Sequence, residues 1–194
     1  MKFLFGLSFL LVLTGVCFGQ DQPLAYDDRG NLIYYEVVEM KGIAKDQLEA
    51  RATQFFKKNA KLMKLKSSAG DTLMRASGKM VITKTALVLN HPSGEVQYNF
   101  YTETRDGKYR FWLTDYEFIP YQRDRYGNFV ASTVIGTPLE RKPGKLNAGE
   151  WEGYVKHATV RSKVIANQFK DAMNAKQELS PKPKPVGRVS TKEW

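Results

Sequence analysis

The sequence predicts an α+β domain in which an antiparallel sheet packs against two helices that cover one of its faces. Residues 31–40 are rich in β-branched and aromatic residues, as strands are. The segments 44–66 and 149–176 repeat apolar residues at the helical period. Two alternating runs flank an Asp-Gly pair at 106–107, which is typical of a hairpin. The predicted order is therefore strand, helix, several antiparallel strands, helix.

The first 19 residues have the three-part layout of a secretory signal peptide. A lysine precedes an apolar run, and small residues follow it up to Gly19. The run is shorter than the roughly 20 residues that a membrane-spanning helix needs. We therefore expect an exported protein that is periplasmic, envelope-associated or secreted, with cleavage after Gly19 or Gln20. A lipoprotein anchored at Cys17 is the disfavoured alternative, because Val16 stands where a small residue normally precedes that cysteine.

Residues 20–176 are expected to form a single domain, and residues 177–194 a basic, proline-rich tail in an extended conformation. The chain of 194 residues is 42% apolar, which is enough for one ordinary core. Its one cysteine lies in the predicted signal peptide, so we expect no disulfide framework in the mature protein. A formal net charge of +10 favours anionic partners such as lipid headgroups or acidic polysaccharide.

The first half of the domain is predicted to contain a strand, a helix and further strand material. Residues 31–40 form the strand by composition. Apolar residues then recur at helical offsets through 44–66, with charged residues on the opposite side. Residues 71–90 are again rich in strand formers and bend near Ser77, and His-Pro-Ser-Gly at 91–94 predicts a turn.

The second half is predicted to contain a hairpin, a long loop and a second helix. The alternating runs 95–105 and 108–119 meet at the Asp-Gly pair, which favours a two-residue type I′ turn. Residues 120–149 lack periodicity and are rich in Pro and Gly, as in a loop or an insertion. Helical periodicity then returns through 149–176.

The Asp-Gly turn at 106–107 predicts which residues face each other across the hairpin. Pairing Arg105 with Lys108 sets Tyr98 opposite Asp115, and directly opposed residues share a face of the sheet. One face then belongs to the core and carries Val96, Tyr98, Phe100, Phe111 and Leu113. The other face carries Gln97, Asn99, Tyr101, Glu103, Arg110, Trp112, Thr114 and Tyr116.

This second face contains aromatic residues that are suited to contact a ligand. Tyr101 would lie across from Trp112, and Glu103 would lie across from Arg110. Aromatic rings on an exposed sheet face stack on peptides, sugars or bases, although they also pair across strands without any ligand. The basic residues of the following loop would add contacts. The candidate binding residues are Tyr101, Arg110, Trp112, Tyr116, Arg123 and Arg125.

Local motifs for catalysis and metal binding are missing from the sequence. Its two histidines, His91 and His157, have no second ligand at metal spacing nearby. No nucleophile elbow, phosphate-binding glycine loop or calcium loop occurs. The short acids Asp27, Asp106 and Asp124 stand in turn-like sequence, which explains them without chemistry. We therefore expect no catalytic residue, cofactor or metal, while a hydrolase site assembled from distant residues stays open.

Several short motifs resemble a family of exported bacterial domains. They are GNLIYYEVVE at 30–39 with the glycine at 42, KDQL at 45–48 with RA at 51–52, and DGKYRF at 106–111. The family is a domain of unknown function with a fold like that of the TATA-box-binding protein (TBP). The resemblance implies a curved antiparallel sheet with helices on its convex side and an open concave side. It carries over no catalytic residues.

The leading hypothesis is a non-enzymatic binding module whose contacts lie on the open sheet face. Peptide, protein and glycan partners all fit this hypothesis, whereas export disfavours nucleic acid. A second hypothesis is a basic protein that charge holds to anionic lipid or polysaccharide of the envelope, with help from the lysines of the tail. The third is the hydrolase with a site assembled from distant residues.

Overall fold

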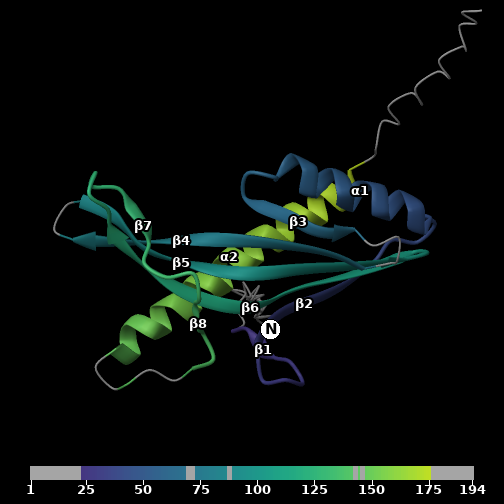
Figure 1. Ribbon diagram of the computed structural model, residues 1–194. Coiled ribbons are helices and arrows are strands. Elements are labelled where there is room, and N and C mark those ends of the chain that lie inside the picture. Colours follow the sequence, from purple (N-terminus) through teal and green to yellow (C-terminus); the bar gives the residue numbers. More distant parts are fainter. Residues whose placement is uncertain (1–22, 69–72, 87–88, 142–143, 145–146, 176–194) are drawn as a thin grey trace, which may run out of the picture.

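The computed structural model describes residues 23–68, 73–86, 89–141, 144 and 147–175. These residues form one antiparallel sheet and two helices (Figure 1). The predicted signal peptide at 1–19, with Cys17 inside it, and the predicted tail at 177–194 lie outside the described residues.

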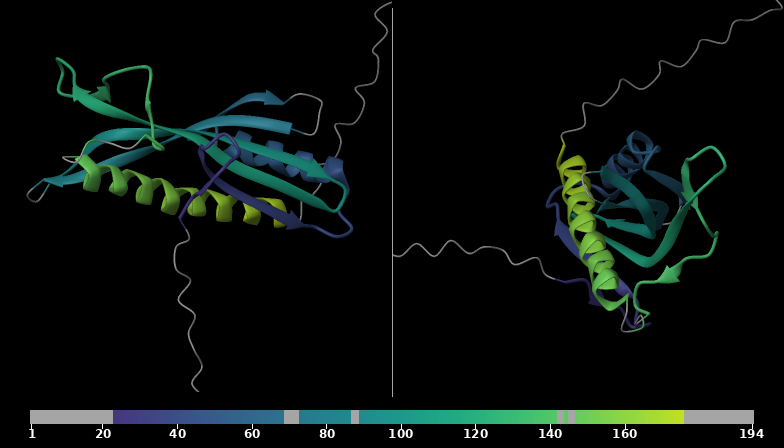
Figure 2. Two further views of the ribbon diagram at one scale, coloured as in Figure 1. Left: turned by 90° about the horizontal axis from the view of Figure 1, so that it is seen from below. Right: turned by 90° about the vertical axis from the view of Figure 1, so that its left-hand side faces the viewer.

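The sheet has the order β1-β2-β6-β5-β4-β3, and the short strands β7 and β8 both pair with β6. All the pairs are antiparallel. Both helices lie on one face of this sheet (Figure 2), which confirms the predicted α+β fold. The strands are β1 (Ala25–Tyr26), β2 (Leu32–Glu39), β3 (Met63–Ser68), β4 (Leu73–Ala86), β5 (Leu89–Arg105), β6 (Lys108–Arg123), β7 (Phe129–Ala131) and β8 (Thr137–Pro138), and the helices are α1 (Lys45–Lys58) and α2 (Ala148–Asn174).

The core between the helices and the sheet is built largely from aromatic rings. The fully buried Phe169 of α2 has its ring centroid 5.1 Å from those of Phe55 on α1, Phe100 on β5 and Phe111 on β6. The rings of Phe100 and Phe111 stack across the hairpin at 5.8 Å. The core face predicted for the hairpin is confirmed: Val96, Tyr98, Phe100, Phe111 and Leu113 are all buried.

The predicted hairpin turn also caps the first helix. Arg105 pairs with Lys108 as predicted, and Gly107 between them has a φ of 72°, a conformation that glycine adopts without strain. Ala44 at the start of α1 has no side-chain cap, but the carboxylate of Asp106 accepts a hydrogen bond of 2.7 Å from the Lys45 amide. An acceptor from the hairpin thus satisfies an amide that a serine or threonine usually caps.

The predicted first helix is too long, because its last part is a strand. Helix α1 ends at Lys58, and β3 begins at Met63. Met63 is buried and pairs with Gly78 of β4, so pairing with the next strand prevails over the local helical pattern. Strand β4 itself runs unbroken through residues 77–78, where a bend was predicted.

The turn predicted at 91–94 is wrong, since β5 passes through these residues. The ladder between β4 and β5 shifts register here, with Gly94 opposite Ile82 and Pro92 opposite Thr83. A proline fits this position because β5 has no β6 partner before Gly94, so no ladder amide is lost on that side. Gly94 is required for packing: a Cβ there would lie 2.6 Å from the Phe118 ring.

The predicted loop at 120–149 is only partly a loop. Strand β6 continues to Arg123, and the chain returns through β7 and β8 to pair with β6 again. Leu139 is buried, and its carbonyl accepts a hydrogen bond of 2.9 Å from the Trp151 indole of α2. Long-range contacts therefore order a segment that has no periodicity of its own. The second helix is confirmed as Ala148–Asn174.

Candidate functional site

Four side chains form a row across the face of the sheet that the helices leave uncovered. They come from four neighbouring strands: Tyr35 (β2) pairs with Trp112 (β6), which pairs with Tyr101 (β5), which pairs with Arg75 (β4). The rings of Trp112 and Tyr101 stack with centroids 5.2 Å apart, and the Tyr35 ring lies 6.4 Å from Trp112. The Arg75 guanidinium carbon lies 5.6 Å from the Tyr101 ring centre. We call these four residues the cross-strand row.

A cluster of charged residues borders the cross-strand row on the side of the hairpin turn. Arg110 places its guanidinium carbon 5.5 Å from the Trp112 ring centre and donates a hydrogen bond of 2.6 Å to Glu103. Arg105 donates to the other carboxylate oxygen of Glu103 at 2.9 Å. Burial alone would raise the pKa of Glu103, but these two arginines outweigh it and hold that pKa below its ordinary value. The carboxylate is therefore ionised at neutral pH, and the cluster keeps a net positive charge.

The cross-strand row is accessible at its β2 end. Tyr35 is 49% exposed and the neighbouring Val37 is 54% exposed, whereas Tyr101 and Trp112 are half-buried. A hollow of about 190 Å³ lies at this end of the row, bordered by Tyr35, Val37 and the charged residues of the hairpin. Neighbouring exposed apolar side chains beside a hollow are a feature of surfaces that contact a ligand.

The candidate residues predicted from sequence are only partly brought together. Tyr101, Arg110 and Trp112 share the uncovered face, as predicted. Arg123 and Arg125 lie at the opposite end of β6 and beyond, where Arg123 stacks on the Phe129 ring at 4.9 Å and Arg125 lies over Tyr126. At about 3.3 Å per strand residue they are roughly 35 Å from Trp112, too far to share one small ligand with it.

Tyr116 is not on the uncovered face, and its predicted placement there is wrong. Its side chain is fully buried, and its hydroxyl lies 2.8 Å from the Ser162 hydroxyl of α2. The cause is a β-bulge: the register between β5 and β6 shifts, and Asp115 takes a φ of 56°. The extra residue turns every later side chain of β6 to the face opposite the predicted one.

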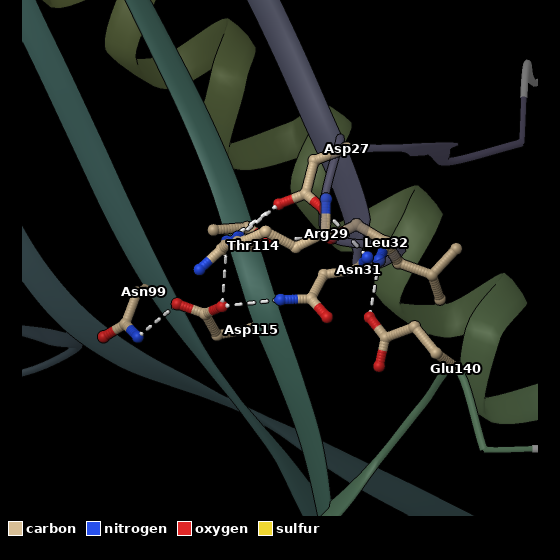
Figure 3. Close-up of polar contacts among 8 residues, drawn as sticks. All are labelled: Asp27, Arg29, Asn31, Leu32, Asn99, Thr114, Asp115 and Glu140. Atoms are coloured by element: carbon tan, nitrogen blue, oxygen red, sulfur yellow. Dashed lines mark hydrogen bonds and ion pairs between the residues drawn. The ribbon is translucent and has the colours of Figure 1, made fainter.

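Residues from three other parts of the chain hold the bulge in place (Figure 3). The Asp115 carboxylate accepts hydrogen bonds from Asn99 of β5 at 2.9 Å and from Asn31 at 3.3 Å, and it forms an ion pair with Arg29 at 3.3 Å. Past the bulge, β8 replaces β2 as the partner of β6, and Glu140 accepts a hydrogen bond of 2.5 Å from the Leu32 amide. This network holds β6 between its two partners and thereby positions Trp112 next to Tyr35.

A second polar cluster lies around Glu95, farther along the uncovered face. Glu95 is 3% exposed and is held by Lys79 at 2.8 Å, the Tyr121 hydroxyl at 2.6 Å and the Gln97 amide at 3.0 Å. Burial would raise the pKa of Glu95, but these partners hold it below its ordinary value. Burial and Glu95 together raise the pKa of Tyr121 to about 12. Both groups are therefore fixed in one ionisation state at neutral pH.

Two side chains of the cross-strand row were missed by sequence reasoning, Tyr35 and Arg75. The alternation of β2 places Tyr35 and Val37 on one side of that strand, and this signal was available. The sequence did not show that β2 lies beside β6, because that pairing joins segments far apart in the chain.

Within the described residues, no group of three or more His, Cys, Asp or Glu side chains is arranged to hold a metal ion. His91 stacks on Phe129 with ring centres 5.8 Å apart, and the Nε2 atom of His157 is buried without a hydrogen-bond partner. Neither of the described helices is long and apolar enough to cross a membrane.

The same strands carry a family signature. Residues 34–118 match the sequence model of a family described as a domain of unknown function (DUF4468) with TBP-like fold. This segment is therefore similar to DUF4468 domains. The matched segment runs from β2 to β6, so it contains all four residues of the cross-strand row.

Two solved structures are similar to this chain in fold. One is a TBP-like protein from Parabacteroides distasonis ATCC 8503, with 14% identity and a TM-score of 0.55 over 77% of this chain and 97% of that one. The other is a DUF4468 family protein from Bacteroides ovatus ATCC 8483, with 12% identity and a TM-score of 0.57 over 80% of this chain and 92% of that one. At this level of identity they establish the TBP-like fold alone. No curated protein matches the chain.

Proposed function

We propose that this protein is a non-enzymatic binding module that works outside the cytoplasm, with the cross-strand row as its contact surface. The observation that carries the proposal is the continuous contact from Tyr35 through Trp112 and Tyr101 to Arg75 on the face opposite α1 and α2. The support for export is the signal-peptide pattern of the first 19 residues.

The row is suited to binding because its side chains are already in place. Trp112 is held between two rings and beneath the Arg110 guanidinium, so little side-chain entropy remains to be lost when a ligand docks. Trp, Tyr and Arg are the residue types that carry most of the energy at interfaces. Their flat faces and polar edges fit both the backbone of an extended peptide and the rings of a glycan.

The test is a binding screen of the purified protein against peptide and glycan arrays at low and high salt. We expect a hit that persists near 1 M salt, where the screening length falls to about 3 Å. In the Trp112→Ala variant that hit should weaken by about 2 kcal/mol, or roughly 25-fold. The matched control is Tyr126→Ala, which removes an aromatic ring that is 79% exposed but lies far from the cross-strand row.

The outcomes separate the proposal from the other two hypotheses. Binding only at low salt, unchanged by Trp112→Ala, would favour attachment to anionic lipid or polysaccharide by charge. Turnover of an array compound would favour the hydrolase. Unfolding of the Trp112→Ala variant, seen by circular dichroism, would assign the ring to fold stability, and Trp112→Phe would then be used to keep the stack while changing the contact surface.

A further inference from the structure

We propose that the partner is an extended peptide that adds as a new strand to the open edge of β2, at residues 34–39, and lays its side chains beside the cross-strand row. This inference rests on the proposed function and names the class of its ligand. Strand addition uses main-chain hydrogen bonds for affinity and pockets for alternate side chains for specificity. The structure supplies both at one place.

The outer edge of β2 is only partly covered. Strand β1 pairs with Leu32 and Ile33 alone, so in the described part of the chain no strand lies outside residues 34–39 (Figure 1). The Met40 amide donates to Gly107 at 2.8 Å, on the β6 side. Because amide directions alternate along a strand, Tyr35, Val37 and Glu39 direct their amides and carbonyls away from β6. These groups are the ones that an added strand would pair with.

The two long edges of the sheet differ in how they are protected. Strand β3, at the other edge, carries the exposed lysines Lys64 and Lys66 and has a register shift between Leu65 and Ser67. Lysines and bulges are devices that stop an edge from pairing with another strand. The edge of β2 has neither a bulge nor a lysine: residues 33–39 pair with β6 in unbroken register, and their charged residues are Glu36 and Glu39. This edge is therefore competent for pairing.

The surroundings of the edge indicate the chemistry of the peptide. Tyr35 and Val37 are apolar and exposed, and they alternate with residues on the other side of β2. Beside them, the Arg105 and Arg110 side chains are 65% and 46% exposed, while the Glu103 carboxylate between them is 12% exposed. Charge complementarity thus favours a strand that alternates apolar and acidic residues. A further hollow of about 370 Å³, where β1 stops, leaves room for the end of such a strand.

The experiment selects binders to the purified protein from a phage-displayed library of eight-residue peptides in which apolar and acidic residues alternate. The affinity of the selected peptide is measured by calorimetry for the wild type, for Val37→Pro and for the matched control Val37→Thr. Proline removes an edge-facing amide and leaves the ladder to β6 intact, whereas threonine keeps the amide and suits a strand. We expect at least a tenfold loss for proline and less than a threefold change for threonine.

A second measurement tests strand geometry on the side of the peptide. N-methylation is moved one residue at a time along the selected peptide. A strand alternates the directions of its amides, so methylation should abolish binding at every second position and be tolerated at the positions between. Loss at all positions, or at none, would overturn strand addition.

The remaining outcomes separate this inference from the proposed function. If Trp112→Ala abolishes peptide binding but Val37→Pro does not, the cross-strand row binds without the edge, and only the inference fails. The same holds if glycans bind and no peptide does. A wild-type dimer in sedimentation that Val37→Pro converts to monomer would show that a second copy occupies the edge, which also overturns the inference. Silence on both arrays overturns both proposals.

Discussion

Asp115 carries a prediction that tests the placement of the candidate site. The residue has a φ of 56° at the bulge of β6. This left-handed backbone conformation costs an ordinary L-residue roughly 1–2 kcal/mol, and it costs a β-branched residue more. We predict that Asp115→Val destabilises the protein by about 2–4 kcal/mol. Valine adds the backbone strain and also removes the hydrogen bond from Asn99, worth about 1 kcal/mol. The pair with Arg29, whose side chain is 63% exposed, adds at most a few tenths.

Asp115→Gly is the matched control, because it removes the same contacts and relieves the backbone. We expect its free energy of unfolding to exceed that of Asp115→Val by about 1–2 kcal/mol. Urea unfolding followed by far-ultraviolet circular dichroism measures both values. If the two variants agree within about 0.5 kcal/mol, the bulge does not depend on backbone conformation, and the account of why Tyr116 is buried fails.

Three further predictions concern the core, the helix cap and the dependence on pH. Phe169→Ala should cost about 3–5 kcal/mol in urea unfolding, since the ring contacts both α1 and the sheet; a loss under about 1.5 kcal/mol would contradict the packing. Asp106→Ala should cost about 1 kcal/mol by leaving the Lys45 amide without its acceptor, and Asp106→Asn should restore most of this; equal losses would refute the cap. Burial, and to a lesser degree Arg161, lower the pKa of His157, so the unfolded chain binds that proton first as the pH falls. The stability that neutral His157 contributes is complete above about pH 6.5, the pKa of histidine in the unfolded chain, and it is lost as the pH falls below that value. The free energy of unfolding of His157→Gln should therefore decline less between about pH 7.5 and pH 5 than that of the wild type. An unchanged slope would contradict the role of His157 in this decline.

The hairpin shows how far sequence reasoning reaches at the candidate site. The Asp-Gly turn predicts the register near the turn, and the structure confirms it as far as Asn99 opposite Thr114. That placed Tyr101 and Trp112 on one face correctly. Beyond that point the Asp115 bulge changes the register, and the prediction for Tyr116 fails. An aspartate in a run of strand residues gives no local sign of a bulge, because its partners Asn31 and Asn99 are distant in sequence.

Local sequence determined the parts of this protein that short-range physics governs. Helical periodicity, strand composition and the conformational freedom of Gly107 act within a few residues, so they predicted α2, β2 and the hairpin. Tertiary structure decided the parts in which pairing between strands overrides the pattern of a single segment. Pairing with β4 made a strand of 63–68, and pairing with β6 made strands within the predicted loop. Only the assembled sheet set Tyr35 beside Trp112, because contacts between distant strands form a surface that neither strand encodes alone.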